Sequence, residues 1–155
     1  MSSEKPVKKK ILFLCTHNSA RSQMAEGLLR SMSGDRYEAY SAGIVATYVD
    51  PRAIKVMSEI GIDISAQASK DMEKYGGILF DVAVTVCDKA KEMCPLCGVS
   101  LEAPAKTPAA KETIHKAFRD PAEAEGSEQE QLKVFRQVRD EIKEWIARTF
   151  VDKVT

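Results

Sequence analysis

Cys15 and Arg21 are separated by five residues in the segment Cys15-Thr16-His17-Asn18-Ser19-Ala20-Arg21, a spacing that can build an anion site. The backbone N–H groups of such a loop can turn inward as a nest for an anion. Arg21 adds a planar guanidinium that can bind two oxygens of a tetrahedral anion, and a following helix would direct its positive end at the same point. These groups would also stabilise a thiolate, the attacking form of cysteine. We therefore expect Cys15 to be a nucleophile in an oxyanion-binding loop.

Three nearby side chains could support this chemistry. Ser22 can donate a hydrogen bond to the Cys15 sulfur. Asn18 can brace the loop, because asparagine tolerates a left-handed backbone conformation. His17 could act as a base or contribute only its backbone, and we favour the second because Arg21 and the helix end already activate the thiol. The expected oxyanion-binding residues are Thr16, His17, Asn18, Ser19, Ala20, Arg21 and Ser22.

The spacing of Cys15 and Arg21 is by itself a weak signal, because chance alone produces such pairs. Its placement strengthens it, since the apolar run Ile11–Leu14 precedes the loop and a segment with helical apolar spacing follows. The alternative is a buried structural cysteine beside an unrelated surface arginine. The order of strand, loop and helix favours the catalytic interpretation.

Composition and charge exclude some classes of function. The formal net charge is zero, with 23 basic and 23 acidic side chains, so nothing draws the chain as a whole toward nucleic acid or an anionic membrane. The basic run Lys8–Lys10 is then a solvated lead-in to a strand. The next apolar run is too short for a signal peptide or a membrane span. We expect a soluble cytoplasmic protein, whose four cysteines are catalytic, redox-active or metal-binding.

Apolar periodicity predicts the elements that position the loop. Strands are expected at 11–14, 37–42, 80–86 and 113–118, and helices at 22–32, 51–60 and 127–150. This alternation predicts an α/β fold, an open parallel sheet with helices on both faces. We expect one domain over residues 7–155 after a disordered tail at 1–6.

The predicted topology brings three chemically able residues together. In an open parallel sheet the site lies beyond the carboxyl ends of the strands, and Cys15, Cys87 and Asp120 each follow a predicted strand. In the last helix, Ser127 and Glu130 form a capping-box pattern, and Trp145 lies on the apolar stripe as a packing residue.

A family resemblance rests on five segments: Cys15–Gly27, Ser41–Gly43, Val84–Cys87, Cys94-Pro95 and Asp120-Pro121. On these segments the chain resembles the low-molecular-weight protein tyrosine phosphatase superfamily and, within it, the thiol-coupled arsenate reductases. The resemblance implies a four-stranded open parallel sheet flanked by helices on both faces. It also implies that the cysteine of the loop is the nucleophile and that Asp120 is the general acid.

The loop does not separate the two activities, because phosphate and arsenate have nearly the same shape and charge. A phosphatase ends its cycle with water and needs one thiol, whereas a reductase must supply two electrons and needs further thiols. Cys87 and Cys94 fit those roles, which the reductase family fills at matching places. We expect an arsenate adduct of Cys15, then a Cys15–Cys87 disulfide that releases arsenite, then a Cys87–Cys94 disulfide that thioredoxin reduces. Glutaredoxin or another small thiol stays open as the reductant.

The spacing of the second and third thiols has a physical consequence. Seven residues along a helix span about 10 Å, whereas a disulfide tolerates Cα separations of only about 4.4–6.8 Å. If Asp88–Met93 is helical in the reduced protein, it must unwind when Cys87 bonds Cys94. Cys97 completes a C-x-x-C motif with Cys94, so either thiol could resolve Cys87. The segment 98–111 is longer than the family commonly has and would form a flexible cover.

Asp120 has a structural alternative, since an aspartate before proline commonly begins a turn or a helix, as Asp50-Pro51 does. The family match favours the role of general acid for Asp120 over a purely structural role. The next position after the proline is Ala122, whereas tyrosine phosphatases usually carry aromatic residues there, which argues against a phosphotyrosine substrate. Arsenate reductase is therefore the leading function and a phosphatase hydrolysing phosphate monoesters is the alternative. A non-enzymatic zinc or partner-binding module is a distant third.

The sequence offers two candidate metal sites. Zinc could be held by the set Cys87, Cys94, Cys97 and His115, although the irregular spacing argues against it. Some reductases of the resembled family bind potassium near the loop, and the matching oxygen ligands here would be Asn18, Glu26, Ser41 and Asp71. No other cofactor is expected.

Overall fold

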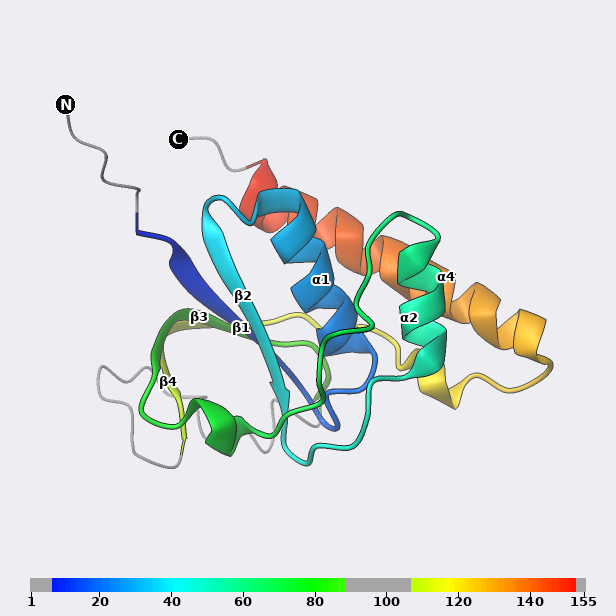
Figure 1. Cartoon of the computed structure of the whole chain (residues 1–155), viewed down its shortest axis with the longest axis horizontal. Helices are drawn as coiled ribbons and strands as arrows, with labels where there is room; N and C mark the ends of the chain where they lie inside the picture. The colour runs from blue at the N-terminus through cyan, green and yellow to red at the C-terminus, as the bar shows by residue number, and fades with distance from the viewer. Residues whose placement is uncertain (1–6, 89–106, 153–155) are drawn as a thin grey trace.

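The computed structural model describes residues 7–88 and 107–152 (Figure 1). Three sequence predictions fall outside the described residues: the tail at 1–6, the helical state of the segment 89–93, and the positions of Cys94 and Cys97. The same applies to residues 98–106 of the expected cover.

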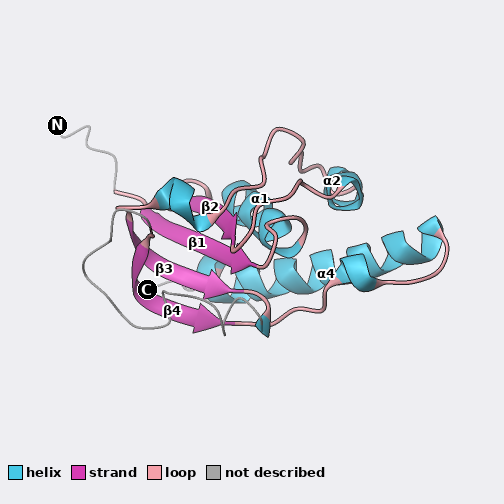
Figure 2. Ribbon diagram, turned by 90° about the horizontal axis from the view of Figure 1, so that it is seen from below, coloured by secondary structure: helices cyan, strands magenta, loops and turns pink. Residues whose placement is uncertain are grey.

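Four parallel strands form one sheet in the order β2-β1-β3-β4 (Figure 2). Their bounds are Lys9–Cys15 for β1, Tyr37–Gly43 for β2, Leu79–Thr85 for β3 and Ala109–His115 for β4. The run of apolar residues in β1 fits its place inside the sheet, where side chains on both faces are covered. The predicted four-stranded parallel sheet is confirmed.

Three helices lie on one face of the sheet, where α1 packs against β1 and β2 and contacts both other helices, which also contact each other (Figure 1). They are α1 (Arg21–Ser33), α2 (Pro51–Ser58) and α4 (Glu128–Ile146). Two begin at the predicted caps, where the Asp50 carboxylate accepts from the Arg52 N–H and the Ser127 hydroxyl from the Glu130 N–H. Phe13 of β1 and Phe135 of α4 are fully buried in this layer. No helix among the described residues is long and apolar enough to cross a bilayer.

The second face of the sheet carries a smaller cluster. Leu12 and Leu14 of β1 point into it and are buried beside Tyr75 from the 3₁₀ helix η1 (Met72–Tyr75). The Tyr75 ring meets Tyr40 and Phe80 edge-on, with ring centroids 5.4 and 5.8 Å away. Within residues 7–88 and 107–152, η1 is the helical cover of this face.

The position of the fourth strand corrects the sequence prediction of 113–118. The strand begins four residues earlier at Ala109, because Ala109 and Ala110 are buried against β3 although alanine has low strand propensity. Beyond its end, the Phe118 N–H still donates to the Val86 carbonyl at 2.9 Å. This extended stretch leads the chain to Asp120 at the carboxyl edge of the sheet.

Candidate active site

The loop from Cys15 to Arg21 joins the end of β1 to the start of α1. Its backbone turns into the helix at Ala20, the N-cap residue, and no side chain within residues 7–88 and 107–152 caps that end. The first N–H groups of α1 are therefore left without a side-chain acceptor, which is the situation that favours an anion at a helix N-terminus. Cys15 is buried and lines the cavity in front of this helix end.

A short chain of hydrogen bonds supports the Cys15 sulfur. The Ser22 hydroxyl oxygen lies 2.8 Å from Cys15 Sγ and accepts from the Asn18 side-chain amide, also at 2.8 Å. The orientation of that amide is fixed, because its oxygen faces the backbone N–H of Lys70 at 2.9 Å. Since Ser22 already accepts from Asn18, its own proton is free to point at the sulfur. The Ser22 hydroxyl is therefore placed to donate a hydrogen bond to the Cys15 sulfur.

Asn18 adopts the left-handed conformation expected of it, with a φ of 51°. Its backbone carbonyl and side-chain oxygen both accept from the Gln23 amide, at 3.0 and 2.8 Å. Both residues are fully buried. Asn18 therefore braces the loop as predicted, whereas the contribution of Gln23 was not predicted from the sequence.

Gly43, at the end of β2, leaves the space in which the loop turns. A Cβ atom at this position would lie 2.7 Å from the Asn18 nitrogen, 2.8 Å from the His17 carbonyl carbon and 2.9 Å from the Thr16 oxygen. All three are backbone atoms, so a side chain here would displace the loop itself. The sequence showed Gly43 only as part of the family match.

Arg21 and Asp120 face each other across the mouth of the site. An Arg21 guanidinium nitrogen lies 3.5 Å from an Asp120 carboxylate oxygen, and another donates to the Phe118 carbonyl at 3.1 Å. The second carboxylate oxygen of Asp120 accepts from the Ala122 N–H at 3.0 Å. Asp120 thus begins a turn, η2 (Pro121–Glu123), and also lines the cavity that contains Cys15. The turn agrees with the structural alternative, and the place of Asp120 in the cavity wall leaves its role as general acid a prediction.

The cavity above Cys15 measures about 340 Å³. Its far wall contains Tyr48, Arg52 and Ala122. The Arg52 guanidinium donates to the Asp50 carboxylate at 2.7 Å, and this hydrogen bonding to Asp50 is the main cause that raises the pKa of Arg52. Ala122 supplies no aromatic wall, as predicted, but the exposed Tyr48 does, from a loop that the sequence did not connect to the site.

Cys87 lies beside the same loop. Its sulfur is 3.4 Å from the hydroxyl of Thr16, the residue that follows Cys15. The adjoining strands β1 and β3 cause this proximity, since the Val86 N–H donates to the Leu14 carbonyl at 2.9 Å. Cys87 lines a second cavity of about 360 Å³, which shares Arg21, His17 and Asp120 with the first. The cavities of the two thiols therefore share one rim, formed by His17, Arg21 and Asp120.

His17 is exposed at that rim. Its carbonyl accepts from the hydroxyls of Ser69 and Thr47, at 2.9 and 3.4 Å. These bonds hold the loop to neighbouring segments through the backbone. The geometry agrees with the backbone role favoured for His17.

The proposed zinc set receives no support from His115. Its two ring nitrogens face the Thr85 hydroxyl at 2.8 Å and an Asp88 carboxylate oxygen at 2.9 Å. Both nitrogens are thus already in hydrogen bonds. In the part of the chain that the structure describes, no three histidine, cysteine or acidic side chains group as metal ligands.

The four residues considered for potassium do not form one ligand set. Glu26 and Ser41 touch, with 2.6 Å between their side-chain oxygens. Asn18 uses its amide oxygen for the two N–H donors already described, and Asp71 accepts from the Glu73 N–H at the start of η1. The Lys70 ammonium instead lies 3.5 Å from a Glu26 oxygen. Burial lowers the pKa of Lys70, and the Glu26 carboxylate opposes that shift.

Comparisons with known proteins agree with this geometry. A family model described as low molecular weight phosphotyrosine protein phosphatase matches residues 10–154. An arsenate reductase of Halalkalibacterium halodurans is 48% identical over 145 residues, which cover 94% of this chain and 96% of that protein.

Two solved structures extend the comparison. An arsenate reductase in the phosphate-binding state has a TM-score of 0.63 at 34% identity, covering 90% of this chain and 95% of the other. A thioredoxin-dependent arsenate reductase of Corynebacterium glutamicum has a TM-score of 0.59 at 23% identity, covering 92% of this chain and 62% of that one. The second is similar in fold.

Replacing Gly43 by alanine is expected to lower activity roughly a hundredfold, because the loop must move by a sizeable fraction of an ångström. The measurement is the rate of the reaction catalysed at Cys15, together with a melting curve. Gly61→Ala is the matched control, since Gly61 has a φ of 80° but nothing within 4 Å of an added Cβ. It should lose stability and keep activity. Equal activity losses in both variants would contradict the clearance argument.

Replacing Ser22 by alanine is expected to slow alkylation of Cys15 by iodoacetamide at mildly acidic pH by roughly tenfold, because a hydrogen bond to the thiolate is lost. Mass spectrometry of the Cys15 peptide gives the rate. Ser58→Ala is the control, because the hydroxyl of this exposed serine donates to the Lys55 carbonyl, away from Cys15. An unchanged alkylation rate in Ser22→Ala would show that the hydroxyl does not act on the sulfur.

Proposed function

The chain belongs to the low molecular weight phosphotyrosine protein phosphatase family, and we propose that it acts as an arsenate reductase that converts arsenate to arsenite. The observation that carries this proposal is the second thiol, because Cys87 lies beside the loop of the first. A phosphatase does not require a second thiol, whereas a reductase must obtain two electrons from thiols. The similarity to arsenate reductases over nearly the whole chain agrees with this choice.

In the first step, arsenate enters the cavity and its oxygens meet the loop N–H groups and the Arg21 guanidinium. The Cys15 thiolate attacks arsenic, and a sulfur–arsenic bond forms as an arsenic–oxygen bond breaks. Asp120 gives its proton to the departing oxygen, which leaves as water. Its place among the residues that line the cavity containing Cys15 supports this role.

In the second step, the Cys87 thiolate attacks the Cys15 sulfur. A Cys15–Cys87 disulfide forms, the sulfur–arsenic bond breaks, and its electron pair stays on arsenic, which leaves as arsenite. The two thiols thereby supply both electrons of the reduction. The hydrogen bond between Cys87 and Thr16 supports this step, because it holds the second sulfur against the loop that begins at Cys15.

In the last step, Cys94 or Cys97 attacks Cys87 and releases Cys15 for another cycle, and an external dithiol reduces the new disulfide. We propose thioredoxin as that dithiol and the cytoplasm as the compartment, where thiols are kept reduced. A thioredoxin-dependent arsenate reductase shares this fold, which is consistent with the proposal.

Phosphatase activity is the second candidate, favoured by one observation. Tyr48 stands at the rim of the cavity and could contact an aromatic leaving group. The same loop would then attack phosphorus, and water would hydrolyse the phosphocysteine. This route needs only Cys15, Arg21 and Asp120, so the two activities separate cleanly in cysteine variants.

Cys87→Ser is expected to abolish arsenate turnover with thioredoxin while it leaves hydrolysis of para-nitrophenyl phosphate at its original level. The reason is that only the reductive cycle uses the second thiol. Arsenite release is measured over many turnovers, and mass spectrometry of the stalled protein should find the Cys15 adduct. Cys94→Ser and Cys97→Ser, compared side by side, identify the resolving thiol. Full arsenate turnover in Cys87→Ser would sink the proposed cycle.

Asp120→Asn is expected to lower kcat for arsenate by about a hundredfold or more, because the departing oxygen loses its proton donor. Asparagine can still accept from the Ala122 N–H, so the turn should survive. Asp63→Asn is the matched control, since Asp63 accepts from the Ser65 N–H in an exposed turn away from the cavity. The rate is measured at saturating arsenate. A kcat equal to that of the original protein would remove Asp120 from the mechanism.

A further inference from the structure

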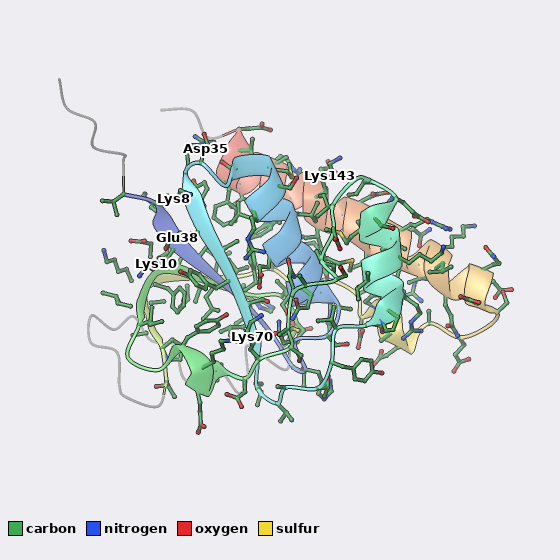
Figure 3. All side chains as sticks on the ribbon, viewed as in Figure 1. Lys8, Lys10, Asp35, Glu38, Lys70 and Lys143 are labelled. Carbon is green, nitrogen blue, oxygen red and sulfur yellow. The ribbon has the colours of Figure 1, made fainter. Side chains whose placement is uncertain are left out.

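A buried ionic cluster joins α1 and β2 to Lys70, which Figure 3 labels beside β2. At its centre is the Glu26 carboxylate, only 6% exposed. One of its oxygens accepts from the Ser41 hydroxyl at 2.6 Å and faces the Lys70 ammonium at 3.5 Å. The other binds the Arg30 guanidinium at 2.7 Å. From the sequence, Glu26 and Ser41 were named only as candidate potassium ligands, and Lys70 and Arg30 beside them were not foreseen.

Lys70 is joined to the site through its backbone as well. Its N–H donates to the Asn18 amide oxygen at 2.9 Å, and its carbonyl accepts from the Gly43 N–H at 2.7 Å. Asn18 in turn donates to the hydroxyl of Ser22, which contacts the Cys15 sulfur. The position of Lys70 is thus linked to the thiol through a continuous set of hydrogen bonds.

The ammonium is held as firmly as the backbone. Lys70 Nζ donates to the Ala68 carbonyl at 2.6 Å, and its side chain is only 9% exposed. A buried carboxylate requires a nearby positive charge, because isolation from water disfavours the ionised form. Arg30 contributes from one side, but its side chain is 52% exposed, so Lys70 is the buried partner.

We propose that the Lys70 ammonium is a built-in cation that holds Glu26 behind the loop and stands where an exchangeable monovalent metal ion would otherwise be required. The oxygens of Glu26 are already bound by three donors, and that of Asn18 by two, so these residues do not fit a potassium ion. Lys70 is a positioning residue, which acts on Cys15 through Asn18. The inference does not depend on which oxyanion the site takes.

The test compares potassium chloride with choline chloride at equal ionic strength, using melting temperature and the alkylation rate of Cys15 as readouts. The protein with Lys70 should show the same values in both salts. Lys70→Ala should melt roughly 5 °C or more lower in choline chloride, because a buried carboxylate loses its partner. It should regain part of that loss and of the alkylation rate in potassium chloride, since the vacated space can take the ion.

Two variants complete the test. Lys74→Ala removes a lysine four residues away on the exposed surface of η1 and should behave as the original protein does in both salts. Lys70→Arg keeps the charge and should not gain a response to potassium. The proposal is overturned if the melting temperature of the original protein is higher in potassium chloride than in choline chloride. This comparison does not depend on whether any variant folds. It is also overturned if Lys70→Ala shows no potassium-specific recovery.

Discussion

The proposed function requires a negative charge on the Cys15 sulfur at the point where β1 turns into α1, and several groups in the structure converge there. The uncapped helix end, the Ser22 hydroxyl and the Arg21 guanidinium all direct positive ends toward the same small volume. The donors that would receive a tetrahedral oxyanion are thus also the groups that favour the attacking form of the thiol. In the proposed function, one arrangement would serve both oxyanion binding and nucleophilic attack.

This convergence depends on backbone geometry that few residues permit. The loop closes because Asn18 adopts a left-handed conformation and because Gly43 has no side chain to collide with it. Gln23 and the backbone of Lys70 hold Asn18 from behind, and the ionic cluster at Glu26 lies next to that support. The rigidity of the loop therefore comes from buried polar contacts that are nearly all satisfied within the fold.

Features encoded in a short stretch of sequence could be predicted. The thiol loop, the strands beside it, the helix caps at Asp50 and Ser127 and the left-handed Asn18 all follow from local spacing and residue type. Features that arise only when two segments distant in the sequence come into contact could not be predicted. Glu26 is buried because β2 and the segment around Lys70 cover one side of α1, and nothing in its own helix indicates that.

The fourth strand and the cavity wall were missed for the same reason. Ala109 and Ala110 carry little strand propensity and are strand residues only because β3 pairs with them. Tyr48 belongs to a loop without apolar periodicity, so its place at the rim appears only when β2 and α2 are in position.

The central claim is that the loop holds an anionic sulfur and a tetrahedral oxyanion at one point. It is tested most directly by the rate at which iodoacetamide alkylates Cys15 at neutral pH, read by mass spectrometry over a series of arsenate and phosphate concentrations. The account predicts that Cys15 reacts faster than the same residue in the unfolded chain. It also predicts that both anions protect it in a saturable manner and that Arg21→Lys weakens the protection. Slow alkylation that neither anion changes would contradict it.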